Sequence, residues 1–102
     1  MDVLGELVNN KLVSIEIIYD HLALKFSSGN SVVINNNFDI NFDGLVKLLN
    51  KKLLRVIDVE QRFQFFFEND CLITVDMTDS GYNCPEALEI FIKKYNELVV
   101  WS

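Results

Sequence analysis

Residues 61–70 read QRFQFFFEND, and four of these ten residues are phenylalanines. Phe63, Phe65 and Phe67 alternate, which predicts one face of a β-strand because successive side chains of a strand point to opposite faces. Phe66 interrupts the alternation and is expected on the other face. Either both faces of this strand are covered, or one aromatic ring is exposed and available to a partner.

This stretch belongs to an internal repeat with a shift of 41 positions. Residues 2–34 align with residues 43–75 without a gap, so that DVLGELVNNKL lies over DGLVKLLNKKL and HLALKF lies over RFQFFF. Phe26 matches Phe67, and most other apolar positions match in kind. A repeat of this size is typical of a supersecondary unit that cannot bury its apolar face alone.

Each unit is predicted to be a short amphipathic helix followed by three antiparallel strands. The helices carry apolar residues at i, i+3 and i+4, and an aspartate, Asp2 or Asp43, stands at the expected N-cap. Turn residues such as Ser28-Gly29-Asn30 separate the strands. The expected helix stripes are Leu4, Leu7 and Val8, and Leu45, Leu48 and Leu49; the expected strands are residues 12–18, 22–26, 31–34, 53–59, 63–67 and 72–75.

Residues 83–102 lie outside the repeat, and the sequence leaves two interpretations open. A cap at Asn83 and Pro85 would begin a helix with an apolar stripe at positions 88, 91, 92 and 95. Alternatively, Leu88, Ile90 and Ile92 alternate as a strand that turns at residues 94–96 and returns as ELVVWS. The crowding of Ile, Phe, Val and Trp favours the hairpin.

The fold class that follows is α+β. We expect a mainly antiparallel, strongly curved sheet or half-barrel of about eight strands with two short helices against it. Phe63, Phe65 and Phe67 match core positions of the first unit, whereas Phe66 matches Lys25 on the outer face. A helix or the terminal hairpin is expected to cover Phe66; otherwise its ring anchors a partner.

Composition indicates a soluble cytoplasmic protein. A chain of 102 residues, half of it apolar, suffices for one domain, residues 1–102, with one core. Its acidic N-terminus lacks the pattern of a secretory signal, and no apolar run reaches the roughly 20 residues of a membrane helix. Cys71 and Cys84 are therefore expected to be reduced thiols.

The motifs of catalysis and of cofactor binding are missing. The one histidine, His21, stands at a predicted turn beside Asp20 and is expected to be an exposed turn residue. The sequence contains no CxxC, no HExxH and no glycine-rich phosphate loop. We therefore predict no catalytic residues, no metal, no cofactor and no enzymatic activity.

Charge is more informative. The formal net charge of −6 argues against direct nucleic-acid binding, which needs a basic surface. No basic residue lies between Arg62 and Lys93. The acidic residues of that interval form either a solvated face or a patch that docks on a basic protein; they are Glu68, Asp70, Asp76, Asp79, Glu86 and Glu89.

The whole chain resembles the immunity proteins of bacterial toxin systems, especially those of contact-dependent growth inhibition. The duplicated units NKLVSIEI…LALKFSSG and KKLLRVIDV…FQFFFEND and the ending EALEI…ELVVWS carry the resemblance. It implies a protein that binds one cognate toxin domain in a one-to-one complex and blocks its active site. A ribonuclease is the narrower expectation for that toxin.

Partner-binding residues are nominated from charge and expected exposure, because recognition residues gather in loops and at strand ends. Two alternatives remain: a β-domain that binds a small ligand in the hollow of a curved sheet, and a structural subunit that oligomerises through strand edges. The nominated residues are Glu68, Asp70, Asp76, Asp79, Tyr82, Glu86 and Phe66.

Overall fold

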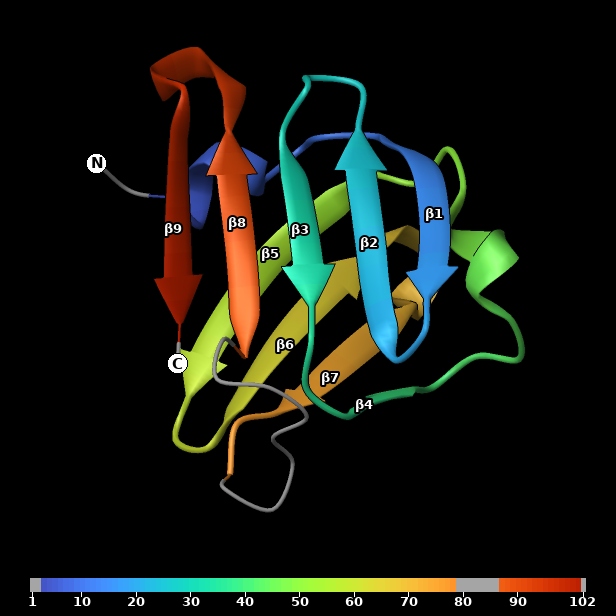
Figure 1. Ribbon diagram of the computed structural model, residues 1–102. Helices are drawn as coiled ribbons and strands as arrows, with labels where there is room; N and C mark the ends of the chain where they lie inside the picture. The colour runs from blue at the N-terminus through green and yellow to red at the C-terminus, as the bar shows by residue number, and fades with distance from the viewer. Residues whose placement is uncertain (1–2, 79–86, 102) are drawn as a thin grey trace.

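The computed structural model describes residues 3–78 and 87–101, which form two antiparallel sheets packed face to face (Figure 1). The helical segments of the described residues are short 3-10 turns: η1 (Gly5–Leu7), η2 (Leu45–Leu48), η3 (Glu68–Asp70) and η5 (Lys93–Tyr95). The five-stranded sheet has the order β1 (Leu12–Ile18), β2 (His21–Phe26), β3 (Ser31–Ile34), β8 (Leu88–Ile92), β9 (Glu97–Trp101). The four-stranded sheet has the order β4 (Phe38–Ile40), β7 (Leu72–Asp76), β6 (Arg62–Phe67), β5 (Leu53–Val59).

The core lies between the two sheets, and alternation along the strands builds it. Phe63, Phe65 and Phe67 are buried, whereas their neighbours on β6 are not. The same holds on β2 and β3, where every second side chain is buried. The rings of Phe26 and Phe67, one from each sheet, stack at 6.5 Å between centroids. The sequence therefore predicted the inner faces correctly.

Residues 41 positions apart occupy corresponding places in the two sheets. Leu12 pairs with Phe26 as Leu53 pairs with Phe67, and both β1 and β5 are irregular at their second residue. At one corner, the residues that precede each of these two strands donate hydrogen bonds to the first residue of the other strand. Asn9 N–H donates to the Leu53 carbonyl at 2.7 Å, and Asn50 N–H donates to the Leu12 carbonyl at 2.7 Å. These bonds join the sheets where β1 and β5 begin.

The tail forms the hairpin rather than the helix. β8 pairs with β3, and β9 returns beside β8 after a turn that ends at Asn96 in the left-handed conformation, with φ 49°. At the tip of the neighbouring β2–β3 turn, Gly29 has φ 92° and approaches Lys93 so closely that a Cβ atom would lie 2.4 Å from its Cδ. The positive φ favours glycine there, whereas the Lys93 side chain could move away from an added Cβ atom.

Three expectations about the fold need correction. The predicted helices are 3-10 turns of three and four residues, because an apolar stripe of three positions spans too little chain to stabilise α-helical turns. Asp43 does not cap η2 but forms an ion pair with Lys47. The described strands number nine, because the unpredicted strand β4 adds to β7, and they form two sheets, because β3 pairs with β8 and not with a strand of the second meander.

β4 occupies the same place beside β7 that β8 occupies beside β3. Phe38 pairs with Val75 as Leu88 pairs with Ile34, and Val75 stands 41 positions after Ile34. The bond from Asp76 N–H to the Asn37 carbonyl matches that from Asn35 N–H to the Ala87 carbonyl, at 2.9 and 3.0 Å. β9 continues only the five-stranded sheet, so that β4 is the last strand of the other sheet.

No helix in the described part of the chain has the length and apolarity needed to cross a membrane.

Candidate functional site

Phe66 lies on the outer face of the four-stranded sheet, as its place in the alternation requires. Among the described residues neither a helix nor the terminal hairpin covers it, contrary to expectation, because the hairpin pairs with β3 in the other sheet. The Arg55 side chain, from the facing position on β5, lies over the ring at 4.4 Å between Cζ and the centroid. This cation–π contact leaves the ring half-buried.

The four described acidic residues between Arg62 and Lys93 do not form one patch. Glu68 and Asp70 lie at one end of β7 and Asp76 at the other, and Glu68 accepts a hydrogen bond from Lys52 N–H at 2.7 Å. Glu89 lies on β8 of the five-stranded sheet and is half-buried. It accepts a hydrogen bond from the Asn35 side chain, directly after β3 of the same sheet, at 2.9 Å. The interval without basic residues in the sequence is not free of them in space, because strand pairing places Arg62 opposite Asp76. Asp79, Tyr82 and Glu86 lie outside the described residues.

Asp70 and Asp76 instead mark the two ends of β4. Asn41, directly after β4, donates its side-chain amide to the Asp70 carbonyl at 2.9 Å. Asn37, directly before β4, accepts from Asp76 N–H. A third carboxylate, that of exposed Asp39, lies in the middle of the strand. Three aspartates thus lie along β4, a strand that the sequence analysis did not predict.

Asp76 has a second partner in Thr78. The Thr78 hydroxyl and backbone N–H both donate to its Oδ1, at 2.5 and 2.8 Å. These bonds favour the ionised carboxylate and hold the pKa of Asp76 below its ordinary value. The stability they contribute is therefore complete above the ordinary carboxyl pKa and is lost as the pH falls through the lowered value.

We expect the substitution Thr78→Ala to raise the pKa of Asp76 towards its ordinary value, because the hydroxyl donor is removed while the backbone donor stays. An NMR titration of the carboxyl carbons measures this pKa. Thr74→Ala, on the same strand as Asp76, serves as the control and should leave the pKa of Asp76 unchanged. An unchanged pKa in Thr78→Ala would assign the shift to another group.

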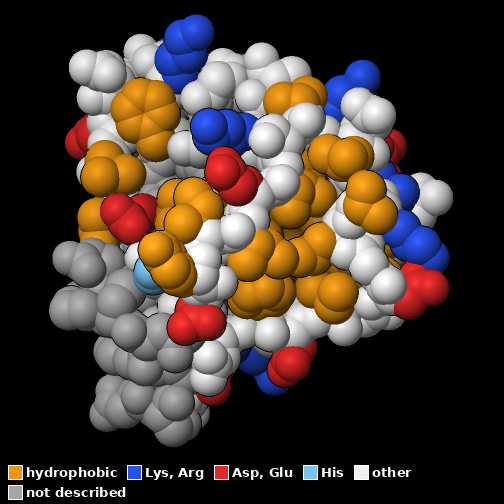
Figure 2. Space-filling model, turned by 45° about the vertical axis from the view of Figure 1, so that its right-hand side comes forward, with side chains coloured by type: hydrophobic (Ala, Val, Ile, Leu, Met, Phe, Trp, Pro, Cys, Tyr) orange, Lys and Arg blue, Asp and Glu red, His pale blue; other side chains and the backbone are white. Residues whose placement is uncertain are grey.

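The described residues leave one side of the sandwich uncovered, between β1, β4 and η2. We call this surface the open side. Ile17 is 60% exposed and Val46 is 69% exposed, and five further apolar side chains there are half-buried. Figure 2 shows apolar side chains gathering on this side of the molecule. The open side comprises Ile15, Ile17, Phe38, Ile40, Phe42, Leu45 and Val46.

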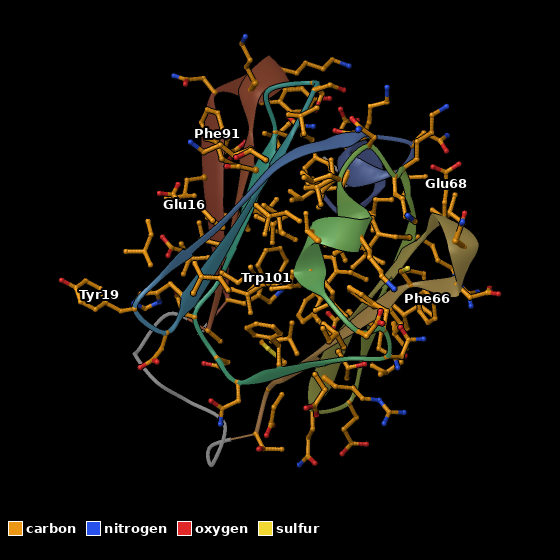
Figure 3. All side chains as sticks on the ribbon, turned by 90° about the vertical axis from the view of Figure 1, so that its right-hand side faces the viewer. Glu16, Tyr19, Phe66, Glu68, Phe91 and Trp101 are labelled. Carbon is orange, nitrogen blue, oxygen red and sulfur yellow. The ribbon has the colours of Figure 1, made fainter. Side chains whose placement is uncertain are left out.

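The opposite side of the sandwich is closed by β9. Trp101 pairs with Leu88, and its ring meets the Phe63 ring edge-on at 5.4 Å between centroids. Figure 3, which looks onto the open side, shows Trp101 between the sheets and Phe66 and Glu68 on the outer face. Leu88 and Ile90 are therefore fully buried, whereas Phe38 and Ile40, the corresponding residues of β4, are only half-buried.

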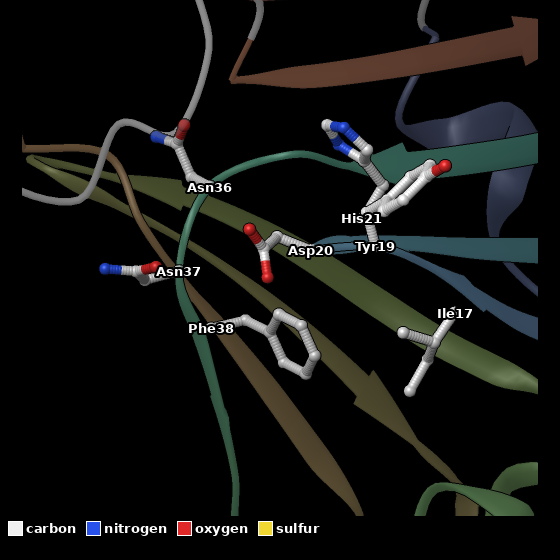
Figure 4. A pocket seen from close by; sticks show the side chains of 7 residues that line it. All are labelled: Ile17, Tyr19, Asp20, His21, Asn36, Asn37 and Phe38. Atoms are coloured by element: carbon white, nitrogen blue, oxygen red, sulfur yellow. The ribbon is translucent and has the colours of Figure 1, made fainter.

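A pocket of 460 Å³ lies at one end of the open side (Figure 4). Ile17 and Phe38 supply its apolar wall, and Asp20 also lines it. Two buried polar atoms of lining residues, Nδ1 of His21 and Oδ1 of Asn36, have no hydrogen-bond partner in the described part of the chain. His21 is thus the first residue of β2 and half-buried, rather than an exposed turn residue.

A second hollow, of 520 Å³, lies where the β2–β3 turn meets the β8–β9 turn and is lined by polar side chains. The buried side chain of Asn30 forms hydrogen bonds with Glu6, Asn10 and Lys93 there. These bonds give Asn30 a structural role.

Cys71 is a buried free thiol, and Cys84 lies outside the described residues. Within residues 3–78 and 87–101, no three His, Cys, Asp or Glu side chains lie close enough together to hold a metal ion. The open side, with its apolar wall and its aspartates, is the surface best suited to a partner. No protein-family model, curated protein or solved structure matches this chain.

Proposed function

We propose that this protein is an immunity protein, which binds a cognate bacterial toxin domain in the cytoplasm and neutralises it by covering its active site. The complex contains one copy of each protein, and the toxin is a nuclease, in the narrower proposal a ribonuclease. The chain contributes no catalysis and no cofactor. The observation that carries the proposal is the apolar open side with the aspartates of β4 beside it.

An exposed apolar surface of this kind favours a protein partner. A monomeric domain gains nothing from leaving Ile17 and Val46 in water, and apolar patches rimmed by polar residues commonly mark interaction sites. The carboxylates of Asp39, Asp70 and Asp76 add the charge that attracts a basic protein. A nuclease has such a basic surface, because it binds the phosphates of its substrate.

We infer that the two meanders are copies of one duplicated unit, and that together they form a half-barrel that is open between β1 and β4. The equal registers of β1–β2 and β5–β6 support the duplication. The bridge between Lys11 and Lys52 supports a continuous wall on the side where β1 and β5 begin.

A small-ligand-binding protein is the second candidate. The observation that favours it is the 460 Å³ pocket with the unpartnered atoms of His21 and Asn36. Polar groups that converge in an apolar pocket are typical of ligand sites.

Co-expression tests the proposed function directly. The C-terminal domain of the protein encoded immediately upstream is expressed with and without this chain, and growth is scored. Growth arrest that this chain relieves, together with a one-to-one complex on co-purification, is the expected result. Growth arrest without relief, or the absence of toxicity, contradicts the proposal and leaves the small-ligand interpretation to be tested.

Charge reversal provides a second prediction. We expect Asp39→Lys combined with Asp70→Lys to slow association with the toxin by about tenfold at low ionic strength and to weaken its salt dependence. Stopped-flow mixing at several salt concentrations measures the rate. Glu97→Lys, at an exposed position of β9, reverses one charge away from β4 and is the control; it should change the rate by much less than half of the effect of the double variant. Equal rates for the double variant and the control would show that these aspartates do not steer the partner.

A further inference from the structure

We propose that the partner binds by adding an extended segment to the free edge of β4, antiparallel to it, and by placing a large apolar side chain in the pocket between Ile17 and Phe38. The inference deepens the proposed function, on which it depends only for the identity of the partner. The segment it requires alternates large apolar residues with Lys or Arg.

The internal correspondence of the two sheets locates this segment. β4 lies beside β7 as β8 lies beside β3, with matching pairs and matching hydrogen bonds. After β8 the chain turns back and adds β9, whereas after β4 it leaves for η2. Among the described strands only β7 pairs with β4. The place next to β4 is therefore the counterpart of the place that β9 fills.

The same correspondence says what enters the pocket. Trp101 of β9 pairs with Leu88 and packs on Phe63. The residues that correspond to Leu88 and Phe63 are Phe38 and buried Leu22, which pairs with Ile17. The pocket between Ile17 and Phe38 is thus the counterpart of the space that Trp101 fills. An aromatic or large aliphatic side chain of the partner fits there.

The sequence of the open side agrees with an occupant. The residue that corresponds to Ile17 is Asp58, and both side chains are exposed. A charged residue at this place is thus compatible with the fold, yet the open side carries an isoleucine that is 60% exposed. Burial of that side chain by a partner gives it a favourable role.

Main-chain groups complete the site, because among the described strands β4 pairs only with β7 and its other edge is available to an added strand. Strand addition supplies affinity through main-chain hydrogen bonds and specificity through side-chain pockets.

Charge decides the chemistry of the segment. Exposed Asp39 projects between the inward residues Phe38 and Ile40, so that it faces the outward residues of an added strand. Asp20 lines the pocket, and none of the described residues that line it is a lysine or an arginine. Outward Lys or Arg residues on the segment are complementary to these carboxylates.

The test uses a pair of variants at corresponding positions. Ile17→Asp places at the open side the residue that position 58 already carries, and it is expected to leave the thermal unfolding midpoint unchanged while weakening toxin binding at least about tenfold. Asp58→Ile, on the closed side, should change binding by less than about twofold. Equal binding of Ile17→Asp and the parent protein would overturn the proposal for this partner.

A test without the toxin separates this inference from the proposed function. Short random displayed peptides are selected on the parent protein and counter-selected on Ile17→Asp. Enrichment of alternating apolar and basic sequences, with amide NMR shifts centred on residues 38–40, supports docking at β4 even if no toxin is neutralised. No enrichment, or shifts centred elsewhere, overturns it. A dimer of the protein alone that Ile17→Asp dissociates would assign the edge to a second copy and would also overturn it.

Discussion

Replacing Phe65 with alanine is expected to lower the free energy of unfolding by about 3–5 kcal/mol. The ring is fully buried between the sheets and stacks beside Phe63 at 6.4 Å between centroids. Truncation removes its transfer free energy and leaves a cavity that the surrounding strands fill only in part. Since domains of this size are stable by about 5–15 kcal/mol, the variant is expected to be partly unfolded at moderate temperature.

Phe66 is the matched control, because it has the same side chain at the adjacent position on the opposite face. Phe66→Ala loses a half-buried ring and the contact with Arg55, a cation–π interaction worth about 0.5–1 kcal/mol at exposed sites. Equilibrium urea denaturation of the two variants compares them directly. A loss for Phe66→Ala as large as that for Phe65→Ala would mean that the outer face of β6 is packed as tightly as the core.

The strands could be predicted from the sequence because their signal is local. Leu12–Ile18, Ser31–Ile34 and Leu53–Val59 have the predicted bounds, since alternation of apolar residues and turn residues at both ends define such segments. The helices were wrong for a related reason. Their stripes satisfy the helical period over a single turn only, and a 3-10 turn places Leu7 or Leu48 in the core equally well.

β4 has no comparable signal. The strand comprises three residues, and its pairing with β7 joins positions 38 and 75, which lie far apart in the chain. The division into two sheets depends on long-range pairing as well, here of β3 with β8. Neither periodicity nor turn chemistry reports which edges of two meanders will meet.

The sequence led to acidic residues but not to the surface on which they lie. Asp70 and Asp76 were nominated as acidic residues of loops and strand ends, and the structure places them at the two ends of β4. Ile17 could not be nominated. Its alternation with Ile15 is typical of a buried strand face, whereas the structure leaves its side chain 60% exposed on the open side.

Asn30 gives the second large effect on stability. Its side chain is buried, donates to the Glu6 carbonyl and to Asn10 Oδ1 at 3.2 and 3.0 Å, and accepts from Lys93 N–H at 2.9 Å. It thus ties the β2–β3 turn to the η1 segment and to the β8–β9 turn. We expect Asn30→Ala to lower the free energy of unfolding by about 2–4 kcal/mol, because each lost bond contributes about 1 kcal/mol and buried partners are left unsatisfied.

The residue that corresponds to Asn30 in the other sheet is Cys71, which is buried without such a network. Cys71→Ala is therefore the control for loss of packing at this position and is expected to cost about 1 kcal/mol. Hydrogen exchange distinguishes the two mechanisms. In Asn30→Ala the amide of Lys93 should exchange faster than the amides of β6, whereas in Cys71→Ala it should not. Equal losses of stability with no local change at Lys93 would mean that Asn30 acts through its volume alone. Faster exchange confined to Lys93 and its neighbours would instead mean that the amide network holds the β8–β9 turn, and with it Trp101, on the closed side of the sandwich.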